Sequence, residues 1–262
     1  MENKSQTLFL VLAAFFITNA LLAELIGVKI FSFESTFGLP ALGFGFLGYV
    51  LDLNFSAGVI LWPAVFITTD IINEYFGKAG VRKISFVTVG CIIFAFAAIA
   101  IVRWLSPAEF WVQIGLQSSP GGDFDINYAF DKIFGQSLGI IVGSLIAFLI
   151  GQFLDVAVFQ RLRKLTGEKA VWLRATGSTL VSQLVDSFVV LFVAFYILSP
   201  KGFSWELSQV FSVGTLNYIY KFIVAIALTP VIYIAHSLID RYLGTEQAEK
   251  IKAKAASSTF IT

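Results

Sequence analysis

Long apolar runs, separated by shorter polar stretches, dominate the pattern of the chain. A transmembrane helix needs about 20 predominantly apolar residues to cross the hydrocarbon core of a bilayer. Two of the runs contain uncharged stretches of that length, Ile84–Val102 and Ile133–Leu154. The pattern therefore predicts an all-α, polytopic membrane protein of about six transmembrane helices. The predicted spans are Leu8–Ile30, Ser56–Phe76, Ile84–Trp104, Ile133–Phe153, Arg174–Leu198 and Leu207–Ile239.

Three segments depart from this simple pattern. Leu207–Ile239 is longer than one span requires and contains Pro230, so we expect it to tilt, to kink or to continue past the membrane. Phe31–Phe55 carries only a short apolar run, and a hairpin, a re-entrant element and a short surface helix all fit it. The polar end of the chain predicts a solvated helix or a disordered terminus. We therefore expect one transmembrane domain over residues 1–244 and a polar cytoplasmic tail over residues 245–262.

The distribution of basic residues predicts the orientation of these spans through the positive-inside rule. With the N-terminus in the cytoplasm, thirteen of the 18 Lys and Arg residues fall on the cytoplasmic side. The loop before the fourth predicted span is acidic instead, and it contains Glu109, Asp125 and Asp131. We therefore predict an N-in, C-in protein with an even number of spans.

Composition supports a membrane protein and excludes several functions. Hydrophobic residues make up 57% of the chain and charged residues 13%, against about 25% charged residues in soluble domains. A net charge of +1 leaves no basic excess for nucleic acid. His236 is the single histidine, and the chain has no phosphate-binding glycine motif and no nucleophile elbow. We therefore predict that the chain is not an enzyme and needs no metal or cofactor.

Polar residues at membrane depth are the candidates for function. Asp70, Asn73 and Glu74 lie near the end of the second predicted span, and the two carboxylates, four residues apart, share one helix face. Insertion scales assign a cost of about 2.5–3.5 kcal/mol to a charged residue at the bilayer centre, so such groups are expected to be paired or to face water. Glu74 could alternatively be solvated at the cytoplasmic interface, whereas Asp70 lies about one turn deeper.

The fifth predicted span carries a polar stripe. Ser178, Ser182 and Asp186 recur every four residues, and Gln183 belongs to the adjoining row. Serine residues alone would fit interhelical packing. Because a carboxylate and an amide accompany them, we favour a hydrated cavity lined by this stripe.

The sixth predicted span combines Asn217 and Lys221, again four residues apart. Two interpretations of Lys221 remain open. Its ammonium group could extend to the outer interface, or it could form a salt bridge with Asp186.

The fourth predicted span carries a row of small residues at every fourth position. Such rows let helix backbones approach closely, so we predict a packing face and place no substrate there. The row consists of Gly135, Gly139, Gly143, Ala147 and Gly151, and Asp155 continues it.

At these residues the sequence resembles the queuosine precursor transporter family of bacteria, also called the VUT family of integral membrane proteins. The resemblance runs in order from roughly Leu8 to Arg241 and so covers most of the chain. The motifs that carry it are Trp62-Pro63, Thr69 through Gly77, Arg174 through Ser187, Asn217-Tyr218 with Lys221, Thr229-Pro230, and Tyr233.

The resemblance implies a multi-pass transporter of the cell inner membrane that imports 7-deazaguanines such as preQ0 or preQ1 for queuosine salvage into tRNA. The expected partners are a small planar heterocyclic substrate and membrane lipid, and a homo-oligomer is left open. We predict a polar substrate site near mid-membrane between the second, fifth and sixth spans. The predicted residues are Asp70, Asn73, Glu74, Gln183, Asp186, Asn217 and Lys221, with Arg174 at a gate and Trp62, Tyr75 and Tyr218 for stacking.

Two rival functions fit the same residues. The chain could be the substrate-binding subunit of a vitamin importer of the energy-coupling-factor type, which needs an ATPase partner. It could also be a non-transporting membrane scaffold whose polar residues only hold helices together. For a transporter, proton coupling and facilitated diffusion are both open.

Overall fold

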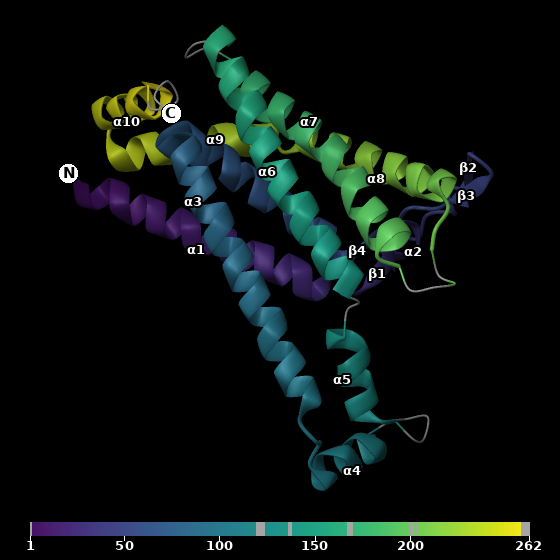
Figure 1. Ribbon diagram of the computed structural model, residues 1–262. Helices are drawn as coiled ribbons and strands as arrows, with labels where there is room; N and C mark the ends of the chain where they lie inside the picture. The colour runs from purple at the N-terminus through teal and green to yellow at the C-terminus, as the bar shows by residue number, and fades with distance from the viewer. Residues whose placement is uncertain are drawn as a thin grey trace.

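The computed structural model describes residues 2–118, 124–135, 138–166, 170–199, 202 and 204–257. Most of these residues are helical, and the predicted all-α membrane architecture is confirmed (Figure 1). The α-helices are α1 (Glu2–Ile26), α2 (Phe33–Phe37), α3 (Trp62–Trp104), α4 (Glu109–Ser118), α5 (Ile126–Phe134), α6 (Leu138–Thr166), α7 (Val171–Leu191), α8 (Leu207–Ala227), α9 (Thr229–Leu243) and α10 (Thr245–Ser257). A short 3-10 helix, η1 (Ala57–Ile60), precedes α3, and a π-helical segment, η2 (Phe192–Ile197), continues α7.

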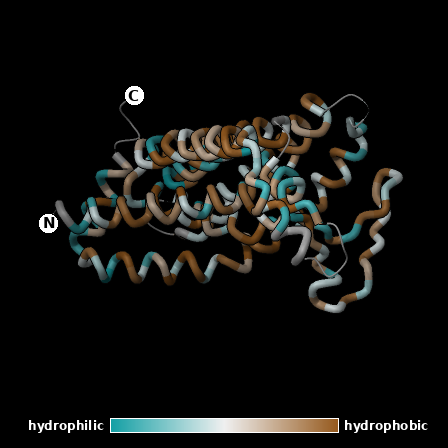
Figure 2. The backbone as a smooth tube through the Cα atoms, turned by 90° about the horizontal axis from the view of Figure 1, so that it is seen from below, coloured by the Kyte–Doolittle hydropathy of each residue, from teal (hydrophilic) through white to brown (hydrophobic). Residues whose placement is uncertain are grey.

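Five helical segments of the described residues are long and apolar enough to cross a membrane. Hydrophobic residues make up most of the length of the long helices (Figure 2). The second predicted span begins in β4 and η1 and lies mostly in α3, the third lies wholly in α3, and α3 is broken at Gly77. This glycine has φ 67° and ψ −172°, a conformation that residues with a Cβ rarely adopt. Gly77 therefore divides α3 into two legs, and the first leg carries the polar motif of the second predicted span.

The sixth predicted span is divided into α8 and α9. The break lies at Leu228, and Pro230 is the second residue of α9, where a proline does not interrupt the hydrogen bonds of the helix interior. Of the three alternatives left open for this segment, the structure thus shows a break just before Pro230. α9 then leads to the end of the bundle where α1 begins (Figure 1).

The row of small residues on α6 packs against α7 and η2, as the sequence predicts. A Cβ atom built on Gly139 would lie 3.0 Å from the backbone oxygen of Leu198, and one on Gly143 would lie 3.2 Å from Ala194. Glycine at these positions lets the two backbones come close. The row thus fixes how α6 sits against the polar stripe of α7.

The segment between α1 and α3 contains a β-hairpin, which is one of the alternatives left open by the sequence. Strands β2 (Phe44–Phe46) and β3 (Tyr49–Leu51) form the hairpin, while β1 (Ile30–Ser32) pairs antiparallel with β4 (Asn54–Ser56). This small β region lies at the opposite end of the molecule from α10 (Figure 1).

The polar end of the chain is a helix over the part that the structure describes, with one face packed against the bundle and most other side chains exposed. In α10, Ala248 and Ala255 are buried. The helix contacts α3 and α9, close to the break at Gly77. Both ends of the described chain lie at the same end of the bundle (Figure 1).

Candidate functional site

A cavity lies between the first leg of α3, the polar face of α7, and α8. It extends from Trp62, near the β region, to Asp70, two turns further along α3. These are the helices between which the sequence predicts the site. The cavity is lined by Val59, Trp62, Pro63, Phe66, Ile67, Asp70, Thr176, Thr179, Gln183, Tyr220, Lys221, Val224, Ala225, Leu228 and Ile232.

The polar side of the cavity has unmet hydrogen-bonding capacity. Asp70 is 1% exposed and Gln183 is 2% exposed. Oδ1 of Asp70 and both amide atoms of Gln183 have no hydrogen-bond partner among the residues that the structure describes. Buried polar atoms in folded proteins are nearly always paired. A carboxylate oxygen, an amide N–H group and an amide oxygen are therefore available to a polar molecule in this cavity.

The other walls are aromatic and aliphatic. The rings of Trp62 and Phe66 are stacked at 29°, with centroids 6.0 Å apart, and Tyr220 contributes a third ring. Tyr220 in turn packs against Phe55 of β4, at a centroid distance of 4.5 Å. A flat, apolar-faced molecule with polar edges would match this combination of walls.

Lys221 places a cation at the cavity, and its partner lies behind it. Nζ of Lys221 donates to Oδ2 of Asp186 at 2.5 Å, which is the salt bridge that the sequence left open. Asp186 is not one of the lining residues of the cavity. Its carboxylate therefore neutralises and orients Lys221 and does not itself face the cavity.

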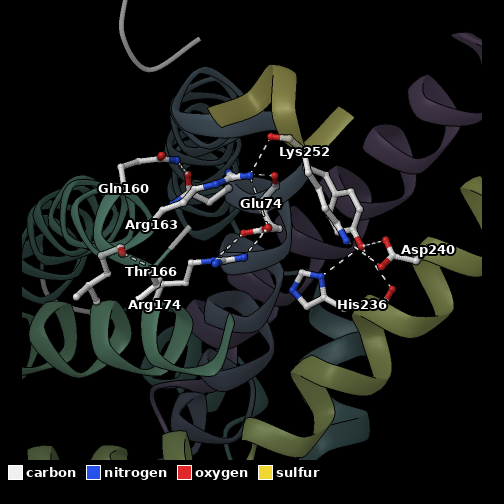
Figure 3. Close-up of polar contacts among 11 residues, drawn as sticks. Glu74, Gln160, Arg163, Thr166, Arg174, His236, Asp240 and Lys252 are labelled. Atoms are coloured by element: carbon white, nitrogen blue, oxygen red, sulfur yellow. Dashed lines mark hydrogen bonds and ion pairs between the residues drawn. The ribbon is translucent and has the colours of Figure 1, made fainter. Parts of the chain in front are cut away.

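A buried ion-pair cluster closes the bundle one turn beyond Asp70 (Figure 3). Nε and Nη2 of Arg174 donate to the two carboxylate oxygens of Glu74 at 3.0 and 2.8 Å. A second guanidinium, that of Arg163, lies 3.6 Å from Oε1 of Glu74. The pairing of Arg174 with Glu74 is predicted by the sequence. Because two cations hold Glu74, its carboxylate has less capacity for a further ligand than that of Asp70.

The cluster continues into α9 and α10 (Figure 3). Nη2 of Arg163 donates to the backbone oxygen of Lys252 at 2.9 Å, and Nζ of Lys252 donates to Asp240 at 2.8 Å. The hydroxyl of Tyr75 donates to the same Asp240 carboxylate at 2.6 Å, and the Tyr75 ring stacks on His236. The end of the bundle near the termini is thus tied together by side chains from α3, α6, α9 and α10.

Several predicted site residues do not line the cavity. Asn73 is fully buried, and its Oδ1 accepts a hydrogen bond from Gln160 of α6 at 2.6 Å. Tyr75 belongs to the cluster just described. Asn217 and Tyr218 are half-buried on α8, and Tyr218 contacts Phe222 edge-on. Of the predicted residues, the cavity is lined by Asp70, Gln183, Lys221 and Trp62.

Sequence reasoning missed Phe66 and Tyr220 of the cavity wall, and Asp155 behind it. Tyr220 lies between the predicted residues Tyr218 and Lys221, but it does not share the i, i+4 spacing of Asn217 and Lys221 that marks the polar face of this span. Asp155 is 1% exposed and reaches Ser182 of α7, whose hydroxyl lies 3.3 Å from its Oδ1. The sequence feature that could have identified Asp155 is its position at the end of the small-residue row of α6, which packs it against the polar stripe of α7.

Comparison with known proteins gives consistent matches. A family model described as "Putative vitamin uptake transporter" matches residues 56–235. A protein of Bacillus subtilis (strain 168) named "Probable queuosine precursor transporter" is 30% identical over 72% of this chain and 75% of its own length. Its namesake in Haemophilus influenzae is 28% identical over 84% of each chain, and the "Queuosine precursor transporter" of Escherichia coli (strain K12) is 26% identical over 68% of this chain and 70% of its own. No solved structure matches the chain.

Proposed function

The chain belongs to the queuosine precursor transporter family, a family of transporters and not of enzymes, and from this premise we propose that it imports queuosine precursors across the inner membrane. The substrates are 7-deazaguanines such as preQ0 or preQ1. They bind in the cavity between the first leg of α3, α7 and α8. The observation that carries this proposal is the set of unpartnered polar atoms of Asp70 and Gln183 in an aromatic-walled cavity.

The chemistry of a deazaguanine matches these groups. Its ring is planar, and one edge presents adjacent N–H donors beside a carbonyl acceptor. A carboxylate can accept from two adjacent N–H groups, as it does from arginine. The carboxylates of Glu74 and Asp186 are already held by cations, so Asp70 takes this role.

Gln183 and the aromatic residues complete the recognition. An amide can donate to the substrate carbonyl and accept from a ring N–H. Trp62, Phe66 and Tyr220 cover the flat faces of the heterocycle. Lys221 adds a positive charge whose field is largely offset by Asp186. A neutral or singly charged heterocycle therefore fits the charge balance of this cavity.

The test is precursor-dependent formation of queuosine in tRNA. A bacterial strain that cannot make queuosine and lacks its own transporter is given this chain and supplied with preQ0 or preQ1. Expression of the chain should restore queuosine in tRNA. Asp70→Asn and Gln183→Ala should abolish this restoration, because the first replaces a carboxylate oxygen by an NH2 donor and removes its charge, and the second removes the amide at the cavity. Asp131→Asn and Gln113→Ala, at partly or fully exposed positions, should leave it intact.

Reconstitution separates transport from the rival functions. The purified protein in liposomes should take up labelled precursor without any ATPase. Uptake that requires an added ATPase partner would indicate a substrate-binding subunit. If no 7-deazaguanine enters the liposomes or stabilises the purified protein, the proposed function is wrong and a scaffold role is favoured.

A further inference from the structure

Two buried carboxylates from different helices meet at one hydroxyl group. Oγ1 of Thr179 on α7 lies 3.4 Å from Oδ2 of Asp70 on α3 and 3.5 Å from Oδ1 of Asp155 on α6. Both aspartates are 1% exposed. One of the two lines the cavity and the other lies behind it. A substrate that contacts Asp70 is therefore connected to Asp155 through a single side chain.

The pair has no cation to balance it among the described residues. Oδ1 of Asp70 and Oδ2 of Asp155 lack hydrogen-bond partners. The buried ion pairs nearby join Glu74 to Arg174 and Lys221 to Asp186. Other buried or largely buried ionisable side chains are Glu24, which accepts from Ser144, Arg163, which pairs with Glu74, and His236, which contacts Tyr75.

Two neighbouring anions inside a bundle are unfavourable. Their repulsion is weakly screened in a low-dielectric interior. Burial of each charge also costs desolvation free energy that no neighbouring cation offsets. One proton on the pair removes one charge and supplies an O–H donor. The hydroxyls of Thr179 and Ser182 can donate to an ionised carboxylate or accept from a protonated one, so they can hydrogen-bond to the pair in either protonation state.

We propose that the Asp70–Asp155 pair binds one proton and that this proton is carried inward with each substrate molecule. The proposal rests on the proposed function of the cavity. Ring N–H groups of the substrate bind the ionised form of Asp70, so the proton resides on Asp155 in the loaded carrier. When the substrate leaves toward the cytoplasm, the proton leaves Asp155, and the empty pair takes up another from outside. No covalent bond of the substrate changes.

The test uses purified protein in liposomes that enclose a pH-sensitive dye. In sodium-free buffer, external preQ1 or preQ0 should acidify the lumen, and an inward proton gradient should drive accumulation above equilibrium. Asp155→Asn should retain exchange of labelled for unlabelled precursor and lose both proton-dependent effects. Asp155→Glu should retain them, because it keeps an ionisable carboxyl group. Asp131→Asn, which removes a partly exposed carboxylate, should behave as the wild type.

A spectroscopic measurement tests the proton site without transport. The wild-type protein should show the C=O stretch of a buried carboxylic acid in the infrared, and Asp155→Asn should lack that band. Exchange by the wild type without acidification, or accumulation driven by a sodium gradient instead, would overturn the inference and leave the proposed function standing. Failure of the wild type to exchange any precursor would overturn both.

Discussion

Arg174 donates two hydrogen bonds to the carboxylate of Glu74, at 3.0 and 2.8 Å, although the two residues are 100 positions apart in the chain. Both side chains are almost completely buried. The pair joins α7 to the first leg of α3 just before the break at Gly77. It therefore closes the bundle beyond Asp70, on the side where α10 packs.

Glu74→Ala should strongly destabilise the protein. It leaves Arg174 buried without its carboxylate and removes the ion-pair partner of Arg163, and breaking a buried ion pair costs about 3–5 kcal/mol. Thermal unfolding in detergent measures the loss. Lys250→Ala, which breaks an exposed pair with Glu246, should change stability by only about 0–1 kcal/mol. Equal effects of the two variants would contradict the assigned role of the buried pair.

Asp186→Ala should abolish precursor uptake while the protein remains inserted in the membrane. The substitution leaves the Lys221 ammonium at the cavity without its counter-charge. Uptake of labelled precursor, normalised to the amount of protein in the membrane, measures the effect. The exchanged pair Asp186→Lys with Lys221→Asp should recover part of the uptake. Full uptake by Asp186→Ala would reject the ion pair as part of the transport machinery.

Gly143→Leu should loosen the contact of α6 with α7 and η2. A Cβ there already lies 3.2 Å from Ala194, and overpacking of a close contact costs about 1–3 kcal/mol. The matched control is Gly90→Leu, because a Cβ on Gly90 meets no atom within 4 Å. Thermal unfolding should show a lower midpoint for Gly143→Leu alone. A similar loss in both variants would contradict the assigned role of the close contact, because Leu has a higher helix propensity than Gly at either position.

The β region should lose stability at acidic pH through Glu34. Desolvation alone would raise the pKa of the Glu34 carboxyl, but hydrogen bonds from the backbone N–H of Leu53 and the hydroxyl of Ser32 outweigh it and hold the pKa below its ordinary value of 4.5. The ionised form thus stabilises the fold above the unfolded pKa, and this contribution is lost as the pH falls through the folded pKa.

Limited proteolysis of the 31–55 segment at roughly pH 3 and pH 6 tests this dependence, since cleavage follows the population of the opened form. The wild type should be cleaved faster at the lower pH. Glu34→Gln should show the same cleavage rate at both values, because its side chain does not titrate. A pH effect of equal size in Glu34→Gln would assign it to another group.

The sequence predicts the helices and the ion pairs better than the surfaces that they face. Glu74 with Arg174, and Asp186 with Lys221, could be anticipated because a charged group inside an apolar bundle must find a partner. Which carboxylate faces the cavity could not, since it depends on how each helix is rotated about its axis by its neighbours. Asp70, Asp155 and Glu74 look alike in sequence and have different surroundings in the structure.

Two other features escaped the sequence for related reasons. Gly77 marks the end of the second predicted span, but nothing local shows that the chain turns there within one helical element instead of through a loop. The residues of α10 are polar on most sides, and only a few small apolar positions such as Ala248 and Ala255 reveal a packed face. Tertiary contacts of α10 with α3 and α9, absent from the local pattern, decide how α10 packs.

The contact between Arg163 and the backbone oxygen of Lys252 joins residues that leave the ribosome at different times. They are 89 positions apart. At translation rates of about 5–20 residues per second, Lys252 is therefore synthesised about 4–18 seconds after Arg163. By the time α10 is synthesised, every membrane-spanning helix of the described chain has already been made. The sealing of this end of the bundle is therefore a late event in biogenesis, and a protein fused directly after α10 would be made while that contact is still forming.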